Sequence, residues 1–118
     1  MEVVFLLYND DCLKVMSTLK IKSVDMIFAD PPYFLSNGGK SISSGKIVSV
    51  NKGEWDKKEN YEDVNEFTKK WLMLCYQILK DRGSIWVTGT YHNIFDIKKA
   101  MDEIGYKLIN IVIWKKLD

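Results

Sequence analysis

The stretch FADPPYFLSNGG, residues 28–39, joins a hydrophobic run to a polar one. Because a residue that precedes proline is restricted to extended backbone, Asp30 should end a strand with its carboxylate at the edge of the sheet. Pro31 and Pro32 have no N–H for a strand ladder, so pairing should stop there and leave their carbonyl oxygens as acceptors. With the flat ring of Tyr33, this set suits a planar ligand that carries an amino group. A simple strand-to-turn stop is the alternative interpretation.

The stretch belongs to a chain in which predicted strands and helices alternate. Strands are predicted from short apolar runs, and helices from apolar residues that recur every three or four positions. The predicted strands cover residues 3–8, 24–29, 84–89 and 107–114, and the predicted helices cover 9–19, 64–82 and 90–105. This alternation is typical of an α/β fold with a largely parallel sheet, whose ligands bind at the carboxyl ends of the strands.

Composition limits the possible classes of protein. The chain has 118 residues, of which 47% are hydrophobic, so one domain with one modest core is expected. The formal net charge is only +1, so any attraction to phosphate must come from local lysine clusters. The two cysteines form no CxxC pair and the short apolar start follows an acid, so we expect a soluble, cytoplasmic chain without membrane association.

The motif and its flanks resemble a known enzyme family. DPPY after a hydrophobic strand resembles the catalytic motif of amino-group DNA methyltransferases that use S-adenosylmethionine. Further segments are similar to the permuted β-class of these enzymes, from restriction–modification systems, at residues 9–33, 36–56, 84–95 and 109–116. The resemblance implies a partial Rossmann-like methyltransferase sheet with flanking helices. It also implies site-specific adenine-N6 methylation of DNA, because Asp rather than Ser begins the motif, and the loop after the motif hints at GATC-type specificity.

The resemblance assigns catalytic roles to the motif, Asp30, Pro31, Pro32 and Tyr33. Tyr33 would stack on an adenine flipped out of the duplex. Asp30 and the Pro31 carbonyl would hold the exocyclic amine with its lone pair facing the methyl group. The reaction would be a direct displacement, so catalysis would depend mostly on positioning and electrostatics.

The resemblance also implies that Asp11, Cys12 and Asp30 contact the cofactor. Two local interpretations compete with this one. Asp11 is equally suited to cap the helix that follows it, and Cys12 has the character of a small buried hydrophobic residue.

A polar segment, residues 36–60, is predicted to be a long mobile loop beside the catalytic strand end. Lys40, Lys46 and Lys52 lie in it and are candidates for contacts with DNA phosphates, with plain solvent exposure as the alternative. His92 is the single histidine, so no metal site is expected.

One feature of the family is not found in the sequence, namely the glycine-rich FxGxG turn that binds the cofactor. Residues 1–118 therefore resemble the catalytic portion of a longer enzyme, without the cofactor glycine motif or the region that recognises the target sequence. In the family's sheet, strands from the other half separate the strands at 3–8 and 24–29. We therefore expect an exposed apolar edge that the remainder of the enzyme, a second chain or a homodimer partner covers.

Several alternatives to an adenine methyltransferase stay open at this point. The chain could be a non-catalytic fragment that binds nucleic acid or a partner methylase. The same acceptor set would also fit an N4-cytosine or RNA methyltransferase, or an enzyme that modifies a protein amide.

Overall fold

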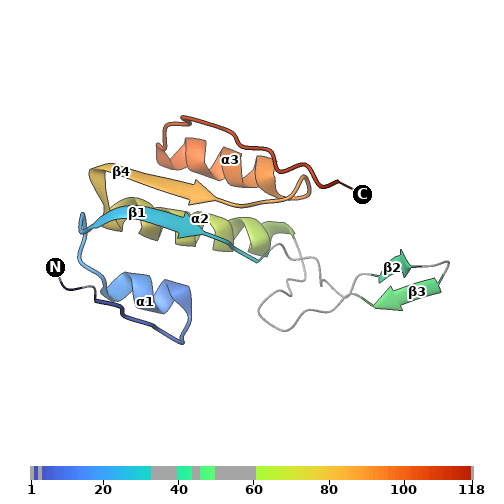
Figure 1. Ribbon diagram of the computed structural model, residues 1–118, viewed down its shortest axis with the longest axis horizontal. Helices are drawn as coiled ribbons and strands as arrows, with labels where there is room; N and C mark the ends of the chain where they lie inside the picture. The colour runs from blue at the N-terminus through green and yellow to red at the C-terminus, as the bar shows by residue number, and fades with distance from the viewer. Residues whose placement is uncertain (1, 3, 33–39, 44–45, 50–60, 118) are drawn as a thin grey trace.

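The computed structural model describes residues 2, 4–32, 40–43, 46–49 and 61–117. Figure 1 shows a small α/β arrangement with helices beside a short sheet. Its elements are α1 (Cys12–Thr18), β1 (Val24–Ala29), β2 (Lys40–Ser43), β3 (Lys46–Ser49), α2 (Tyr61–Ile78), β4 (Leu79–Val87) and α3 (Ile94–Ile104).

The central sheet consists of β1 and β4, which pair in parallel as the alternating sequence predicts. Val24 pairs with Leu79 but Met26 pairs with Ser84, so β4 carries an irregularity between these two positions. Gly83 lies within it, where a Cβ atom would come within 3.0 Å of the Lys80 carbonyl oxygen. The same Cβ atom would lie 3.2 Å from the Asp25 carbonyl oxygen of β1, so glycine permits the close approach of the two strands at this position.

The predicted end of the second helix at residues 82–83 is wrong. α2 ends at Ile78 and β4 begins at the next residue. The physical reason is tertiary, because the Lys22 and Ser23 N–H groups donate hydrogen bonds to the carbonyl oxygens of Gln77 and Ile78, at 3.0 and 2.9 Å. These bonds satisfy the last carbonyls of the helix with groups that lie far away in the sequence.

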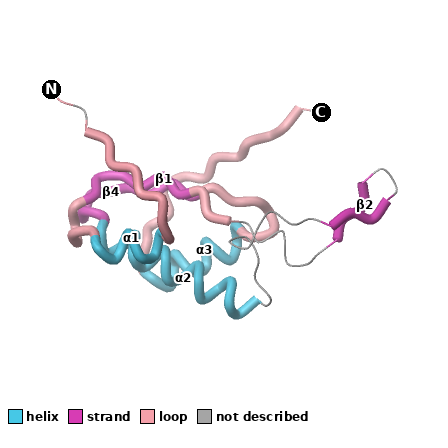
Figure 2. Tube along the Cα trace, turned by 90° about the horizontal axis from the view of Figure 1, so that it is seen from below, coloured by secondary structure: helices cyan, strands magenta, loops and turns pink. Residues whose placement is uncertain are grey.

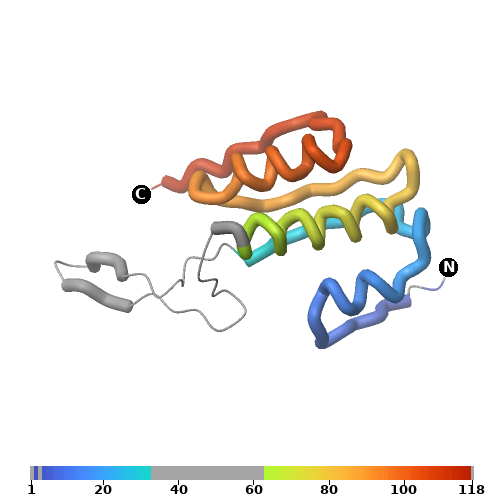
Figure 3. Tube along the Cα trace, turned by 180° about the vertical axis from the view of Figure 1, so that it is seen from behind, coloured from blue at the N-terminus to red at the C-terminus, as the bar shows by residue number. Residues whose placement is uncertain are grey.

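The three described helices cover one face of the sheet, as Figures 2 and 3 show. The core forms between α2, α3 and this face. Its buried members are Trp71, Leu72, Cys75, Ile97 and Ala100, and the strand residues that pack against them include Ile27, Ala29, Ile85 and Val87. Every second residue of each strand therefore points at the helices, as the pleat of a strand requires.

The helix ends follow the local sequence. The Asp11 carboxylate accepts a hydrogen bond from the Leu13 N–H at 2.8 Å and caps α1. α3 ends at Gly105, which has a φ of 118° and donates its N–H to the Met101 carbonyl. The next residue, Tyr106, donates its hydroxyl to the Leu72 carbonyl at 2.6 Å and so ties the end of α3 to α2.

The second face of the sheet has no such cover in the described part of the chain. Met26, Phe28 and Trp86 point away from the helices and are 54%, 67% and 44% exposed. Strands that are apolar on both faces are typical of parallel sheets that are buried on both faces. The exposed apolar side chains near the carboxyl ends of β1 and β4 are therefore suited to contact with a second layer.

Two of the predicted strands are not strands in the structure. Residues 4–8 and 107–114 lie outside any helix or strand. Their apolar side chains are exposed, for example Leu7 at 96% and Trp114 at 90%. A strand needs a neighbour to satisfy its backbone N–H and C=O groups, and within the described residues β1 and β4 pair only with each other. This outcome agrees with the expected gap in the sheet and exposed apolar edge.

The segment at residues 36–60 was expected to be loop throughout, and this is wrong where the structure describes it. β2 and β3 pair there as a short antiparallel sheet of their own, with Lys40 opposite Ser49 and Ser43 opposite Lys46. Alternating Ser, Ile and Val residues on either side of a Ser–Gly pair are a hairpin pattern that the sequence prediction overlooked.

Candidate active site

The carboxyl ends of β1 and β4 and the first turns of α2 and α3 meet at one end of the molecule (Figures 1 and 3). This follows from the connections, because a parallel pair of strands forces each intervening helix to run back in the opposite direction. Ligands of such folds bind at this end. Asp30 directly follows β1 and Thr88 directly follows β4, so the structure brings both residues to the expected position.

Asp30 is exposed, and a hydrogen bond from the neighbouring strand end orients its carboxylate. The Thr88 hydroxyl donates to Asp30 Oδ1 at 2.5 Å. The Thr88 N–H also donates to the Ala29 carbonyl at 3.0 Å, which extends the parallel pairing by one residue. Short hydrogen bonds from a hydroxyl to a carboxylate are among the stronger ones in proteins. The sequence analysis did not identify Thr88, because only the pairing of β1 with β4 places it beside the acid.

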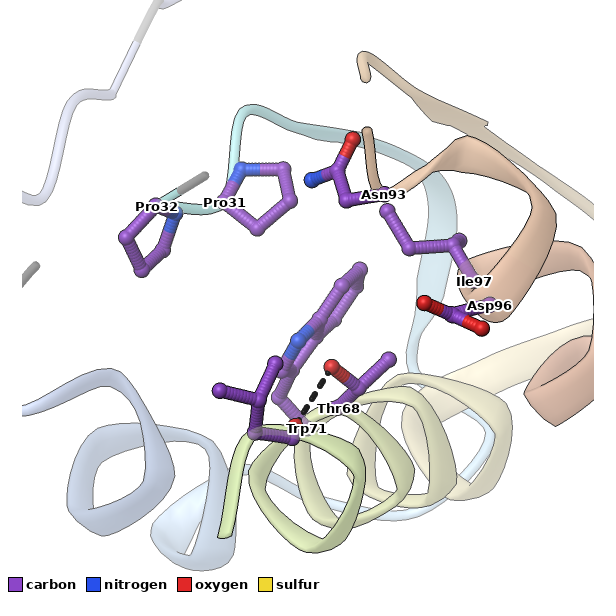
Figure 4. Close-up of a pocket in the computed structure, with 8 residues that line it drawn as sticks. Pro31, Pro32, Thr68, Trp71, Asn93, Asp96 and Ile97 are labelled. Carbon is purple, nitrogen blue, oxygen red and sulfur yellow. Dashed lines mark hydrogen bonds between the residues drawn. The ribbon is translucent and has the colours of Figure 1, made fainter. Parts of the chain in front are cut away.

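The two prolines rest on the helical layer. Both are half-buried and line a small hollow above Trp71 (Figure 4). The hollow measures about 20 Å³, and its other lining residues are Val64, Thr68, Asn93, Asp96 and Ile97. The hollow lies between the two prolines and the helical layer, so its lining residues support the Pro31–Pro32 backbone. The Trp71 ring, only 4% exposed, lies beneath the two prolines and supports them.

The turn that leads from β4 into α3 is held by its own hydrogen bonds. The Asn93 side-chain oxygen accepts from the Thr90 N–H at 2.8 Å. The Asn93 and Ile94 N–H groups donate to the Thr90 carbonyl at 3.1 and 2.8 Å. Figure 4 shows the amide nitrogen of Asn93 on the side facing Pro31. The turn is therefore a stiff element beside the motif, which the sequence analysis treated only as the start of a helix.

The predicted cofactor contacts lie near this end but are only partly assembled. α1 runs opposite to β1, so its first turn lies at the end of the molecule where β1 ends (Figure 1). Asp11 is exposed and acts as the helix cap, the competing interpretation of this residue. Cys12 is exposed, so the interpretation as a small buried residue is wrong. Desolvation of the thiol and the nearby Asp11 carboxylate raise the pKa of Cys12, which disfavours the nucleophilic thiolate.

Other predicted site residues lie wholly or partly outside the described residues. Tyr33 and Lys52 lie outside them. Lys40 and Lys46 are described only through the backbones of β2 and β3. Within the described ranges no cluster of three or more histidine, cysteine or acidic side chains is arranged to hold a metal ion. No helix in those ranges is long and apolar enough to cross a bilayer.

Comparison with known proteins decides the family. Residues 24–118 match the DNA methylase family of N6 and N4 methyltransferases. The chain belongs to this family. The match spans β1, the motif, α2, β4 and α3, so Asp30 and Thr88 lie within it, whereas α1 with Asp11 and Cys12 lies outside it.

Three relatives are type II methyltransferases. The chain is 47% identical over 111 residues to the type II methyltransferase M2.DpnII of Streptococcus pneumoniae. It is 47% identical over 111 residues to M2.LlaDCHI of Lactococcus lactis subsp. cremoris, and 46% identical over 112 residues to M2.MboI of Moraxella bovis. These matches cover 94–95% of this chain but only 41% of each relative. This coverage agrees with the prediction that the chain corresponds to one part of a longer enzyme.

Proposed function

We propose that the chain is the catalytic part of a site-specific DNA methyltransferase that methylates the N6 amine of adenine. The observation that carries the proposal is the position of Asp30, which follows a parallel strand, precedes two prolines and is oriented by Thr88. The family match supports methyl transfer to an amino group of a base, and the relatives' names support a type II restriction–modification context.

In the proposed mechanism the Asp30 carboxylate and the Pro31 carbonyl accept the two hydrogens of the exocyclic amine, and Tyr33 stacks on the base. Two acceptors on a stiff backbone hold the amine so that its lone pair points away from them, toward the methyl donor. S-adenosylmethionine supplies an electrophilic methyl group on a sulfonium. The amine nitrogen would bond to the methyl carbon as the sulfur–carbon bond breaks, the neutral thioether would leave, and the excess proton on the nitrogen would pass to water.

We propose that Asp11 and Asp30 contribute one side of a cofactor site. Asp11 precedes α1 and Asp30 follows β1, and carboxylates suit the hydroxyl and amino groups of a nucleoside. The sequence holds no glycine-rich turn that would let the backbone approach the cofactor. We therefore assign the main cofactor contacts to polypeptide outside these residues.

The uncovered apolar surfaces of the chain point to a partner. The uncovered sheet face and the unpaired apolar segments at 4–8 and 107–114 are surfaces that soluble proteins rarely leave open. The relatives are more than twice as long as the matched region. We propose that the remaining part of the enzyme, on the same or a second polypeptide, adds strands and a second layer here; a homodimer is the competing arrangement. A cytoplasmic location stays a prediction that goes with a DNA substrate.

The test is transfer of labelled methyl from S-adenosylmethionine to duplex DNA with and without a GATC site. The chain is assayed alone and together with the part of the pneumococcal relative that it does not match. Asp30→Ala is the test variant. Asp25→Ala is the matched control, since Asp25 is an exposed acid on the same strand that only pairs with Lys80 at 3.0 Å.

Label on N6 of adenine in the complemented sample, retained in Asp25→Ala and lost in Asp30→Ala, is the expected result. Label on cytosine would redirect the proposal to N4-cytosine methylation. Association of the two parts without any methyl transfer would favour the non-catalytic binding fragment.

A further inference from the structure

Thr88 is held in place from both directions along the chain. On its N-terminal side, β4 pairs with β1 up to Val87, opposite Ala29. On its C-terminal side, the turn closed by Thr90 and Asn93 leads directly into α3. The Thr88 backbone is itself bonded to the Ala29 carbonyl at 3.0 Å. Its hydroxyl therefore reaches Asp30 from a rigid platform.

We infer that Thr88 is a positioning residue for the methyl transfer proposed above: its hydroxyl fixes the rotation of the Asp30 carboxylate through the 2.5 Å bond to Oδ1. The inference rests on the proposed function. It goes beyond it by assigning a role to a residue outside the DPPY motif.

The physical reason lies in the geometry of the motif. Pro31 fixes the backbone after Asp30, but the side chain of an exposed acid can still rotate about its own bonds. Asp30 must present an oxygen to one amine hydrogen while the Pro31 carbonyl takes the other. A carboxylate that rotates away loses that geometry, and small misplacements at a reacting centre have large effects on rate. The bond from Thr88 restricts this rotation before the base arrives.

A purely structural role for Thr88 is the competing explanation. The hydroxyl could merely complete the end of the sheet, in which case any residue of similar shape would serve. Valine matches threonine in shape and keeps the backbone N–H, but it lacks the hydroxyl. Serine keeps the hydroxyl and loses only a methyl group. The two substitutions therefore separate the hydrogen bond from the packing.

The experiment compares Thr88→Val and Thr88→Ser with the wild-type chain in the complemented assay, with separate kcat and KM values for DNA and for S-adenosylmethionine. Thr18→Val is the matched control, because the Thr18 hydroxyl also donates a hydrogen bond, but to the backbone carbonyl of Val15 in α1 and on the surface. A second measurement follows the side-chain carboxyl ¹³C signal of Asp30 in the isotopically labelled chain alone.

We expect Thr88→Val to lower kcat by about tenfold to a hundredfold, the usual effect of one lost hydrogen bond to a charged group. The KM values should stay within about twofold, because that bond orients the acid and does not hold either substrate. Thr88→Ser should recover most of the rate, Thr18→Val should match the wild type, and the Asp30 signal should move in Thr88→Val alone.

An unchanged kcat in Thr88→Val would overturn the inference, as would a serine variant as slow as the valine one or an Asp30 signal that does not respond. If Thr88→Val fails to fold, Thr88→Ser and Thr88→Cys replace the pair, since cysteine is close to serine in shape but a weak donor. A wild-type chain that transfers no methyl group when complemented would instead refute the proposed function, and this inference with it. Methyl transfer by the complemented wild-type chain therefore distinguishes failure of this inference from failure of the proposed function.

Discussion

β1 and the segment at residues 4–8 are both rich in apolar residues, yet they differ in structure. β1 pairs with β4, and its alternate side chains pack on the helical layer. The segment at 4–8 pairs with nothing in the described part of the chain, and its side chains are 54–96% exposed. The comparison teaches that an apolar run becomes a strand only where a neighbour can receive its hydrogen bonds and a second layer can cover it.

The packed region should be the most sensitive to substitution. Leu72 is fully buried in the centre of the core, so Leu72→Ala should lower the free energy of unfolding by about 2–5 kcal/mol. Met73, the next residue of α2, is 42% exposed. Met73→Ala should therefore change the free energy of unfolding by less than about 1 kcal/mol. Urea denaturation of both variants measures the difference. Equal losses would mean that the helical layer does not pack on the sheet as described.

The packed region should also respond to alkaline pH. Burial raises the pKa of the Cys75 thiol from 9.0 to about 11. The unfolded state therefore releases this proton first, so the stabilisation is complete below about pH 9 and is lost as the pH rises to 11. The expected loss of stability from Cys75 is about 2–3 kcal/mol. Burial also raises the pKa of Tyr106, and the resulting loss of stability begins near pH 10.

Unfolding measured between pH 8 and 10, before Tyr106 contributes, checks this prediction. Cys75→Ala should lower stability at every pH because it leaves a cavity, but its curve should be flatter over this range. A slope that is the same in both proteins would assign the pH dependence to other groups.

A smaller effect on stability is expected at Asp11, which lies between the unpaired segment at 4–8 and the packed region. Asp11 caps α1, so Asp11→Ala should cost about 1 kcal/mol, whereas Asp11→Asn should be nearly neutral because Asn caps as well as Asp. If Asp11 also contacts the cofactor through its charge, both variants should raise the KM for S-adenosylmethionine in the complemented enzyme. Thermal unfolding measures the capping role of Asp11, and kinetics measure its predicted contact with the cofactor. An unchanged KM in both variants would mean that Asp11 only caps α1.

The unpaired region should give the smallest effect on stability and a clear effect on assembly. Ile113 is 86% exposed, so Ile113→Ser should change the free energy of unfolding of the chain alone by no more than about 0.5 kcal/mol. It should nevertheless weaken association with the complementing part, because burial of one such side chain contributes about 1.5–3 kcal/mol. Binding measured by calorimetry, with Lys116→Ser as an exposed polar control, checks this. Equal affinities would exclude the segment from the interface.

Several features could be predicted because they are local. Apolar periodicity predicted α2 and α3, Gly105 predicted the end of α3, and the apolar run before the two prolines predicted β1 and the placement of Asp30 at its end. Each depends on residues within one or two turns or on the conformation of a single residue. Thr88 was missed for the opposite reason, since 58 residues separate it from Asp30.

The sequence by itself determined the helical stripe, the strand that stops at Asp30 and the membership of the DNA methylase family. Only the tertiary structure decided that the apolar runs near both ends stay unpaired, that Trp71 supports the prolines and that Thr88 orients Asp30. The reason is that periodicity and backbone restriction act between neighbours in the chain. Strand pairing and core packing depend instead on which distant groups are present to complete them.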